Sequence, residues 1–221
     1  MSFTNLLVMD VDSTLTSTEG IDLLADLAGS GPAVAAITER AMRGELDFAA
    51  SLRERVATLR GLPASAVDQA RAQVSLSPGA RPLIAALRAE GWAVGAVSGG
   101  FLQMVEPLAV ELGLDFYRAN LLEVADAVLT GNVTGPVVDR AAKAAALRQW
   151  AGKLGLGLDK VAAIGDGAND LDMMDAAGLS IAYGGKPAVV AAADYCVSGS
   201  LLEALPILRA FTAVPQADPV T

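Results

Sequence analysis

Hydrophobic and polar positions divide the chain into two kinds of segment. Short runs that are apolar on both faces predict buried strands of a parallel sheet, and runs with apolar residues at helix spacing predict helices. The predicted strands are Asn5–Val11, Trp92–Val97, Val161–Ile164, Leu179–Ala182 and Tyr195–Val197. The predicted helices are Arg81–Glu90, Phe101–Leu112, Ala141–Leu154 and Asp170–Ala177. This alternation predicts an α/β fold with a Rossmann-like, doubly wound parallel sheet.

The segment after the first predicted strand departs from this alternation. From Thr16 to Val74 apolar residues recur at helix spacing, and the pattern predicts no strand. Roughly 60 helical residues are too many for one crossover between neighbouring strands. We therefore expect a helical cap domain at 16–75, inserted into an α/β core made of residues 1–15 and 76–211.

Two further stretches complete the expected organisation. Residues Tyr117–Asp139 have the pattern of short strands with turns at Thr130–Asn132 and Thr134–Pro136, which predicts a hairpin. The Pro-bearing segment Thr212–Thr221 is expected to be a disordered tail.

Composition limits the classes of protein to which the chain can belong. Its 221 residues, 53% of them hydrophobic, suffice for one sizeable core, alone or with a small appended domain. The net charge of −9 argues against a nucleic-acid partner, because phosphate backbones bind basic surfaces. No uncharged run reaches the roughly 18 residues of a membrane span, and no basic region precedes the first apolar residues, as it would in a signal peptide. One cysteine, Cys196, excludes an internal disulfide, and we expect a cytoplasmic protein.

The absence of histidine narrows the chemistry further. It excludes a Ser-His-Asp triad, a phosphohistidine and a His-ligated zinc or iron centre. An enzyme built from this chain must use Asp, Glu, Lys or Tyr as its acids and bases.

Polar residues gather where the predicted strands end. Ligands bind at the carboxyl ends of the strands in open α/β sheets, so side chains that follow different strands are expected to share one site. The candidate residues are Asp10 and Asp12, then Ser98, Gly99 and Gly100, then Asp166, Asn169 and Asp170, with Lys143 near the start of the helix before the third strand.

Taken singly, each group has an ordinary structural explanation. Asp10 and Asp12 fit a strand end followed by a helix cap, and GDGAND at 165–170 fits a glycine turn with Asp caps. A Ser-Gly-Gly turn is usually only a turn, and most helix lysines are solvated. A nucleotide site is not indicated, because no GxxxxGK[ST] motif occurs and Asp170 replaces the third glycine of a dinucleotide fingerprint.

Taken together, the groups predict a phosphoryl-transfer site. A cluster of Asp oxygens suits Mg²⁺, which binds one or two carboxylates together with phosphate oxygen and water. The Ser98 hydroxyl and nearby backbone N–H groups can hold a phosphate, Lys143 can neutralise its charge, and a carboxylate can attack in line. Because the acidic cluster would repel a phosphate in the absence of the metal, we expect strict Mg²⁺ dependence.

The order of these motifs resembles the phosphatases of the haloacid dehalogenase superfamily. DVDST at 10–14, VSGG at 97–100, a lone lysine and GDGAND at 165–170 match the four motifs of that superfamily in sequence. Within the superfamily the chain is similar to the phosphoserine phosphatases from about residue 5 to 210. The further stretches that carry this similarity are TEGID at 18–22, MRGELDF at 42–48, SLRERV at 51–56 and AVSGGF at 96–101.

The resemblance implies roles for the residues at the strand ends. Asp10 would be the nucleophile that forms an aspartyl-phosphate, and Asp12 the acid that protonates the leaving seryl oxygen and then activates water. Neighbouring carboxylates raise the pKa of such an acid and a metal lowers it, so the balance for Asp12 stays open. Mg²⁺ would be held by the side chains of Asp10 and Asp166 and the main-chain carbonyl of Asp12, with Asp170 in support. The phosphoryl group or substrate would be held by Ser98, Gly99, Gly100, Lys143 and Asn169.

The resemblance also implies a substrate pocket in the cap. Glu19 would take the substrate ammonium and Arg55 its carboxylate, which a guanidinium binds bidentately. Met42 and Phe48 would line the closed pocket. Taken alone, the first two would be solvated charges and the last two ordinary helix-packing residues. Cap closure is expected to use hinges near Ser17 and at Ser75–Pro78.

The resulting expectation is a Mg²⁺-dependent phosphoserine phosphatase, a monomer or homodimer that hydrolyses O-phospho-L-serine in the last step of serine biosynthesis. The amino-terminal regulatory domain of some longer relatives is not expected. Two alternatives share the chemistry: transfer of the phosphoryl group to an alcohol such as homoserine, and hydrolysis of another small phosphomonoester. A third is a receiver-domain switch, but such domains phosphorylate an Asp after a later strand and have no use for a helical insertion.

Overall fold

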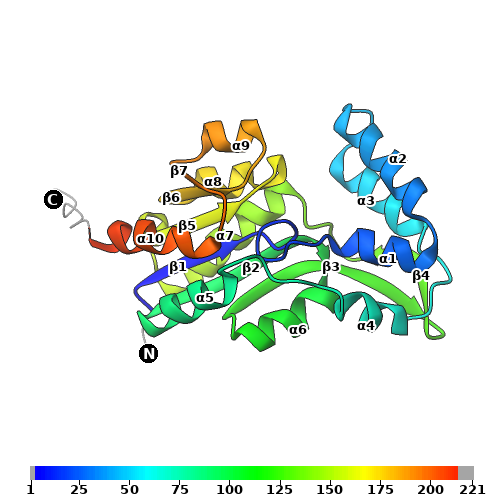
Figure 1. The fold of residues 1–221 in the computed structure, drawn as a ribbon, viewed down its shortest axis with the longest axis horizontal. Coiled ribbons are helices and arrows are strands. Elements are labelled where there is room, and N and C mark those ends of the chain that lie inside the picture. Colours follow the sequence, from blue (N-terminus) through cyan, green and yellow to red (C-terminus); the bar gives the residue numbers. More distant parts are fainter. Residues whose placement is uncertain (1–2, 214–221) are drawn as a thin grey trace.

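The computed structural model describes residues 3–213, which form an α/β fold around one seven-stranded sheet (Figure 1). The strand order is β4-β3-β2-β1-β5-β6-β7, and every neighbouring pair is parallel except β3 and β4. The strands are β1 (Asn5–Met9), β2 (Trp92–Phe101), β3 (Phe116–Ala125), β4 (Val128–Thr134), β5 (Val161–Gly165), β6 (Leu179–Tyr183) and β7 (Tyr195–Val197). The prediction of a doubly wound, largely parallel sheet is confirmed.

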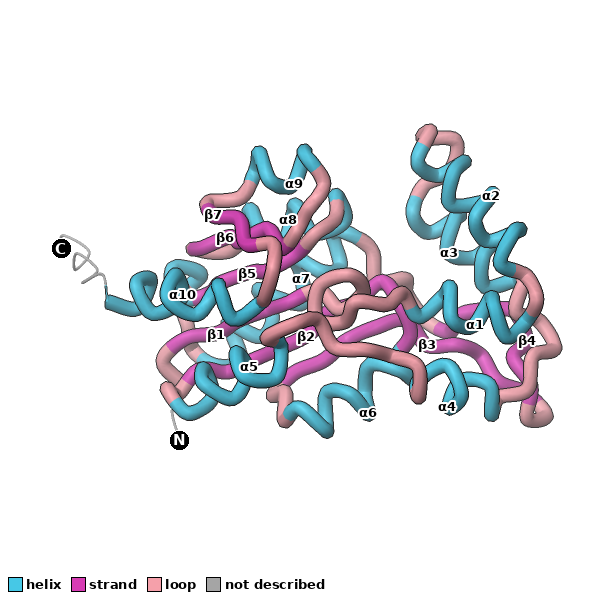
Figure 2. The backbone as a smooth tube through the Cα atoms, in the orientation of Figure 1, coloured by secondary structure: helices cyan, strands magenta, loops and turns pink. Residues whose placement is uncertain are grey.

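Helices cover both faces of the sheet, as Figure 2 shows. The α-helices are α1 (Gly20–Ala28), α2 (Gly31–Met42), α3 (Phe48–Ala57), α4 (Ser65–Arg71), α5 (Ala80–Ala89), α6 (Leu102–Leu112), α7 (Arg140–Leu154), α8 (Leu171–Ala176), α9 (Pro187–Ala192) and α10 (Ala204–Ala213). Short 3₁₀ turns occur at η1 (Leu158–Lys160), η2 (Ala168–Asp170) and η3 (Leu201–Glu203). Helices α5, α6 and α10 pack on one face, and α7, α8 and α9 on the other. No helix of residues 3–213 is long and apolar enough to cross a membrane.

Strand β1 lies at the centre of the sheet and is buried throughout. Leu7 and Met9 point into the core beneath α5 and α6, whereas Leu6 and Val8 point into the core beneath α7 and α8. Because successive strand residues face opposite sides, a strand covered on both faces is apolar on both of them. This explains the unbroken apolar run that precedes Asp10. The one polar residue of β1, Asn5, stands at its start and donates to the carbonyl of Lys160 at 3.3 Å.

Two predicted strand ends were wrong by more than one residue. Strand β1 ends at Met9 rather than Val11. Strand β2 continues through Ser98–Gly100 to Phe101, so these residues extend the strand with a shifted register and do not form a separate turn. Pairing resumes beyond the glycines, because Phe101 lies opposite Asn120 on β3. Helix α6 then begins at once.

The predicted hairpin is present, but its turn lies elsewhere. Strands β3 and β4 pair antiparallel around Asp126 and Ala127, whose φ angles are 49° and 60°. Two consecutive positive φ angles make the tight turn that matches strand twist, usually with Asn or Gly. Residues Thr130–Asn132, where the turn was predicted, lie inside β4, which ends at Thr134, where the second turn was predicted. Ala127 gives no turn signal in the sequence, which explains the error.

Residues 16–75 form helices α1–α4 and no strand. Their apolar side chains share a core with the β3–β4 hairpin, where Leu24, Leu52 and Val56 pack with Leu122 and Leu129. Main-chain hydrogen bonds join the two parts: the N–H of Gly61 donates to the carbonyl of Leu129 at 2.8 Å. The hairpin therefore supports these helices, with α1, α2 and α3 drawn above it and α4 below it in Figure 1.

The predicted tail, Thr212–Thr221, begins inside a helix. Thr212 lies in the last turn of α10. Residues 214–221 lie outside the described residues.

Candidate active site

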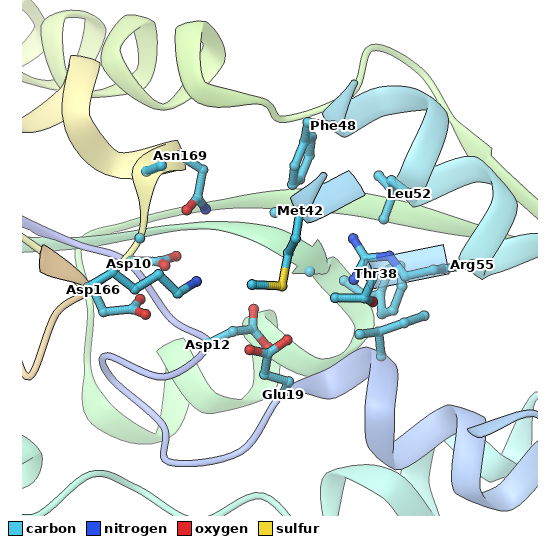
Figure 3. Close-up of a pocket in the computed structure, with 17 residues that line it drawn as sticks. Asp10, Asp12, Glu19, Thr38, Met42, Phe48, Leu52, Arg55, Asp166 and Asn169 are labelled. Atoms are coloured by element: carbon cyan, nitrogen blue, oxygen red, sulfur yellow. The ribbon is translucent and has the colours of Figure 1, made fainter. Parts of the chain in front are cut away.

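A cavity of about 280 Å³ lies where the carboxyl ends of β1, β2 and β5 face helices α1–α3. Figure 3 shows Asp10, Asp166 and Asn169 on one side of it and Thr38, Leu52 and Arg55 on the other. The lining residues are Asp10, Asp12, Glu19, Ile21, Thr38, Met42, Phe48, Leu52, Arg55, Gly99, Gly100, Phe101, Asp166, Gly167, Ala168, Asn169 and Lys186.

A buried lysine joins two carboxylates at the floor of this cavity. The Nζ of Lys143 donates to Oδ1 of Asp10 at 2.6 Å and to Oδ1 of Asp170 at 2.7 Å. Helix α7 carries this lysine and is capped by Asp139, which accepts a hydrogen bond from the N–H of Ala142. Burial alone would lower the pKa of Lys143, but the charges of the two carboxylates outweigh it and raise the pKa above its usual range. The lysine is therefore a fixed positive charge.

Asp10 keeps one oxygen available beside this lysine. Its Oδ1 accepts from Lys143 and, at 2.7 Å, from the N–H of Val11. No group among residues 3–213 donates to its Oδ2. Burial raises the pKa of Asp10 well above the usual value, and Lys143 opposes this, while the charges of Asp170 and Asp12 add to it.

Three carboxylates converge closely enough to bind one cation. Oxygens of Asp10, Asp166 and Asp170 lie within 4.8 Å of one another. Burial and then the charge of Asp170 raise the pKa of Asp166, while the charges of Lys186 and Lys143 and the hydrogen bond from Thr14 oppose this shift. The group fits a hard divalent cation, because it offers only oxygens and one lysine cannot neutralise three carboxylates.

Hydrogen bonds from the main chain orient this carboxylate group. The N–H groups of Asp166 and Gly167 donate to Oδ2 of Asp170 at 3.2 and 3.0 Å. The hydroxyl of Thr14 donates to Oδ1 of Asp166 at 3.3 Å. The GDGAND turn thus holds its own last carboxylate against the strand end.

Asp12 is oriented by both sides of the cavity. Its Oδ1 accepts from the N–H of Gly20, the first residue of α1, at 2.9 Å, and its Oδ2 accepts from the Ser98 hydroxyl at 2.7 Å. The N–H of Gly100 donates in turn to the Ser98 oxygen at 2.7 Å. A Cβ at position 100 would lie 2.7 Å from Oδ2 of Asp12, so a larger residue there would displace this carboxylate. The Asp12 carboxylate is thereby fixed at the cavity wall.

The structure places the predicted residues at two depths. Ser98, Lys143 and Asp170 are buried and do not line the cavity. The Ser98 hydroxyl contacts Asp12 rather than the cavity, a direction that the sequence did not indicate. The other predicted residues all line it.

The side formed by α1–α3 carries opposite charges. The Ser13 hydroxyl donates to Oε1 of Glu19 at 3.3 Å, and burial, then Asp12 and Asp22, raise the pKa of Glu19. Burial lowers the pKa of Arg55, opposed by the charges of Glu19 and Asp22. Among residues 3–213 its guanidinium forms no ion pair and donates only to the carbonyl of Ser51, at 3.4 Å. Arg55 therefore has donors available for an anion.

Phe48 and Met42 bring apolar atoms to the same cavity. A Cβ at Gly99 would lie 2.7 Å from the ring of Phe48, so the first residue of α3 rests against the bare backbone of β2. Met42 ends α2 and is 78% exposed although it lines the cavity.

Several lining residues were missing from the sequence prediction. They are Ile21, Thr38, Leu52, Phe101, Gly167, Ala168 and Lys186. Thr38 and Leu52 lie one helical turn from Met42 and Phe48, so helix spacing could have found them. Lys186 follows the end of β6, where the rule that ligands bind at the carboxyl ends of strands would have placed it.

The chain matches the haloacid dehalogenase-like hydrolases over residues 7–175. It belongs to the haloacid dehalogenase-like hydrolases. Every site residue predicted from the sequence falls within this matched range, whereas Lys186 lies beyond it.

Individual members of this hydrolase family resemble the chain over most of its length. Phosphoserine phosphatase SerB2 of Mycobacterium tuberculosis is 53% identical over 94% of this chain and 51% of its own length. The phosphoserine phosphatase of Streptococcus thermophilus is 52% identical over 87% of this chain and 90% of its own length. The chain thus spans about half the length of some curated relatives that it matches and most of the length of others.

Solved structures of hydrolases in this family agree with the fold. A phospho-aspartyl intermediate analogue of phosphoserine phosphatase and a substrate-bound phosphoserine phosphatase complex each superpose with a TM-score of 0.88. Each is 40% identical and covers 94% of this chain and 100% of its own.

Proposed function

We propose that this hydrolase cleaves O-phospho-L-serine to L-serine and phosphate through a phosphorylated Asp10. One cavity carries the proposal, because it contains an available Asp10 oxygen on the sheet side and, on the helical side, the Arg55 guanidinium, which forms no ion pair within residues 3–213. The names of the relatives and of the superposed structures support the same reaction.

Charge complementarity supports phosphoserine as the substrate. Apart from its phosphate, this molecule presents one ammonium and one carboxylate. Glu19 and Arg55 offer the opposite charges on the same wall of the cavity. Phe48 and Met42 supply apolar contact for the short methylene between these groups. A phosphomonoester that lacks one of these charges would leave exposed Glu19 or half-buried Arg55 without its partner, and so would bind less tightly.

The first half of the reaction transfers the phosphoryl group to the enzyme. Oδ2 of Asp10 attacks phosphorus, and the bond from phosphorus to the seryl oxygen breaks. Asp12 gives a proton to that oxygen, which releases serine. The Ser98 hydroxyl can donate to or accept from Asp12, so this contact persists in both protonation states.

The second half releases phosphate. A water gives its proton to Asp12 and attacks the phosphorus of the aspartyl-phosphate, and the bond to Asp10 breaks. Lys143 stays protonated throughout and offsets the charge of Asp10 in each state. Gly99 and the amide of Asn169 line the space where phosphate would lie, whereas the N–H of Gly100 already donates to the Ser98 hydroxyl.

Mg²⁺ is the cation that we assign to the carboxylates. Asp10, Asp166 and Asp170 would hold it, with the main-chain carbonyl of Asp12. When bound, it would neutralise phosphate charge and stabilise the transition state electrostatically. Manganese is the main competitor for such an oxygen-only site.

Phosphate release from a small panel of substrates tests the proposal. The panel contains O-phospho-L-serine, phosphoethanolamine, which lacks the carboxylate, and 3-phosphoglycerate, which lacks the ammonium. We expect phosphoserine to be strongly preferred and turnover to stop in excess EDTA. Equal turnover of all three compounds would contradict the substrate, and full turnover in EDTA would contradict the metal. Phosphohomoserine formed on addition of homoserine would show transfer in place of hydrolysis.

The proposal also includes the expected location, domain division and oligomeric state. We place the enzyme in the cytoplasm, where a single free cysteine such as Cys196 is typical. We also treat residues 16–75 as a cap domain on a core of 1–15 and 76–211. Sedimentation of the purified enzyme distinguishes the monomer from the homodimer.

A further inference from the structure

The cavity presents an electrostatic difficulty to a phosphate monoester. Four carboxylates line it, those of Asp10, Asp12, Glu19 and Asp166. A phosphate monoester carries a charge of about −1.5 to −2 near pH 7. The protein as a whole adds to the repulsion through its net charge of −9. An approaching phosphate needs a positive group that it can reach before it arrives at the cation site.

Two of the three cationic side chains near the cavity already have another partner or an assigned role. Lys143 is fully buried, bonded to Asp10 and Asp170, and absent from the lining. Arg55 lies on the wall formed by α1–α3, where the proposed function assigns it to the substrate carboxylate. Lys186 is the remaining cation of the lining, and it lies on the sheet side, in the loop between β6 and α9.

Lys186 is held at the rim and keeps its ammonium available. Its main-chain N–H donates to the carbonyl of Asp166 at 3.2 Å, and its carbonyl accepts from the N–H groups of Val189 and Val190 in the first turn of α9. The backbone is thus tied to the strand end that carries Asp166. Within residues 3–213 the side chain forms no ion pair or hydrogen bond, and the residue is exposed. An ammonium that is anchored by its backbone but unpaired at its tip is suited to bind a mobile anion.

We infer that Lys186 is an anion-binding residue of this site, which draws the phosphate group of the substrate into the cavity and binds inorganic phosphate as it leaves. The inference rests on the proposed function for the identity of the substrate. What we infer for Lys186 itself is a contact between its exposed ammonium and a phosphate group. Because Lys186 would act by its charge, arginine should replace it and glutamine should not.

The test compares Lys186→Gln, Lys186→Arg and the matched control Lys153→Gln in the presence of Mg²⁺. Lys153 lies in the last turn of α7, is exposed, and does not line the cavity. The measurements are kcat/KM for O-phospho-L-serine and the inhibition constant of inorganic phosphate, each at low and high ionic strength. For Lys186→Gln we expect kcat/KM to fall and the inhibition constant to rise by about three- to tenfold at low salt. Both effects should shrink at high salt. Lys186→Arg should stay near the wild type, and Lys153→Gln should match it.

Three outcomes would overturn the inference. These are equal effects of Lys186→Gln and Lys153→Gln, a loss that high salt leaves unchanged, and a loss that arginine does not restore. If the wild-type enzyme hydrolyses no phosphoserine, the proposed function fails instead. In that case calorimetric titration of inorganic phosphate into wild type and Lys186→Gln still decides the inference, because it needs no turnover.

Discussion

Lys143 is the residue on which the carboxylate arrangement depends. Its ammonium lies between Asp10 and Asp170, and all three side chains are buried. Removal of a buried partner leaves charges without compensation, which is costlier than the pair is stabilising. The lysine therefore matters for folding as well as for the proposed chemistry.

Replacement of Lys143 by Met should lower the free energy of unfolding by about 3–5 kcal/mol in the absence of metal. Urea denaturation in EDTA measures this change. The control is Lys153→Met on the same helix, whose side chain is exposed and which should change stability little. Equal stabilities of the two variants would show that Lys143 does not hold the carboxylates together.

Glu19 should give the substrate affinity a distinctive pH dependence. Burial and the charges of Asp12 and Asp22 raise its pKa, so it loses its charge at a higher pH than an ordinary glutamate. Only the ionised form attracts the substrate ammonium. The advantage of wild type over Glu19→Gln in kcat/KM should therefore be greatest above the raised pKa and vanish as the pH falls through it. An ionised glutamate should contribute about 1.5–3 kcal/mol to that advantage.

Measurement of kcat/KM for both enzymes between mildly acidic and neutral pH tests this expectation. The ratio between them, rather than either profile alone, isolates Glu19, because Asp10 and Asp166 also have raised pKa values. A ratio that does not change with pH would contradict the assignment of the ammonium to Glu19.

At the residue scale, the sequence predicted which charged residues belong to the site better than it predicted where side chains point. Asp10 and Asp166 were predicted because they follow strands, and the structure brings them together. Ser98 was expected to face a phosphate, yet its hydroxyl contacts Asp12, since the side-chain direction depends on the register shift in β2. Lys186 was not predicted, because no phosphate-binding motif surrounds it in the sequence.

At the scale of elements, the β3–β4 turn is the clearest conflict between local preference and fold. Ala127 has a φ of 60°, which is unfavourable for a residue with a Cβ. Its carbonyl accepts a hydrogen bond from the N–H of Ala64 at 2.8 Å, so contacts with the segment before α4 help to hold this conformation. The turn was placed wrongly because such long-range support leaves no trace in local sequence.

Ala127→Gly should raise the free energy of unfolding by about 0.5–1 kcal/mol, because glycine adopts a positive φ without strain. Thermal or urea denaturation measures this change in the free energy of unfolding. The matched control is Ala145→Gly, at an exposed position inside α7, which should lower stability by roughly 1 kcal/mol. Destabilisation by both substitutions would mean that Ala127 is not strained.

At the scale of the whole molecule, the helices over the cavity differ in how firmly they pack against the rest of the structure. Helix α3 shares an apolar core with the hairpin, whereas α2 buries only Val34. The two linkers expected to act as hinges are bonded together, since the N–H of Ser17 donates to the carbonyl of Ser75 at 2.9 Å. This attachment favours movement of α2 and the loop that follows it over movement of residues 16–75 as one body.

Hydrogen exchange should therefore slow in α2 and at 43–47 when Mg²⁺ and a tight phosphate mimic such as beryllium fluoride bind. Helix α4, which packs on α1 and α6, should show little change and provides the internal control. Equal protection throughout 16–75 would favour closure of the whole segment, and no change at all would exclude closure.

The general architecture could be predicted because strand burial and helix spacing are local patterns. The apolar run at 6–9 and the helical run after Thr16 each carry their own signal. The support of the helices by the hairpin could not be predicted, because it depends on contacts such as Gly61 with Leu129 that are distant in sequence. The burial of Lys143 could not be predicted either, because it also depends on contacts between residues that are distant in sequence.

The most direct test of the central claim is a rapid acid quench of the enzyme with O-phospho-L-serine and Mg²⁺, followed by mass spectrometry of the peptide that contains Asp10. We predict that this peptide gains one phosphoryl group within the first turnover, and that Asp10→Asn neither gains it nor releases phosphate. Release of phosphate at the wild-type rate by Asp10→Asn, or phosphorylation at another residue, would contradict the proposed mechanism.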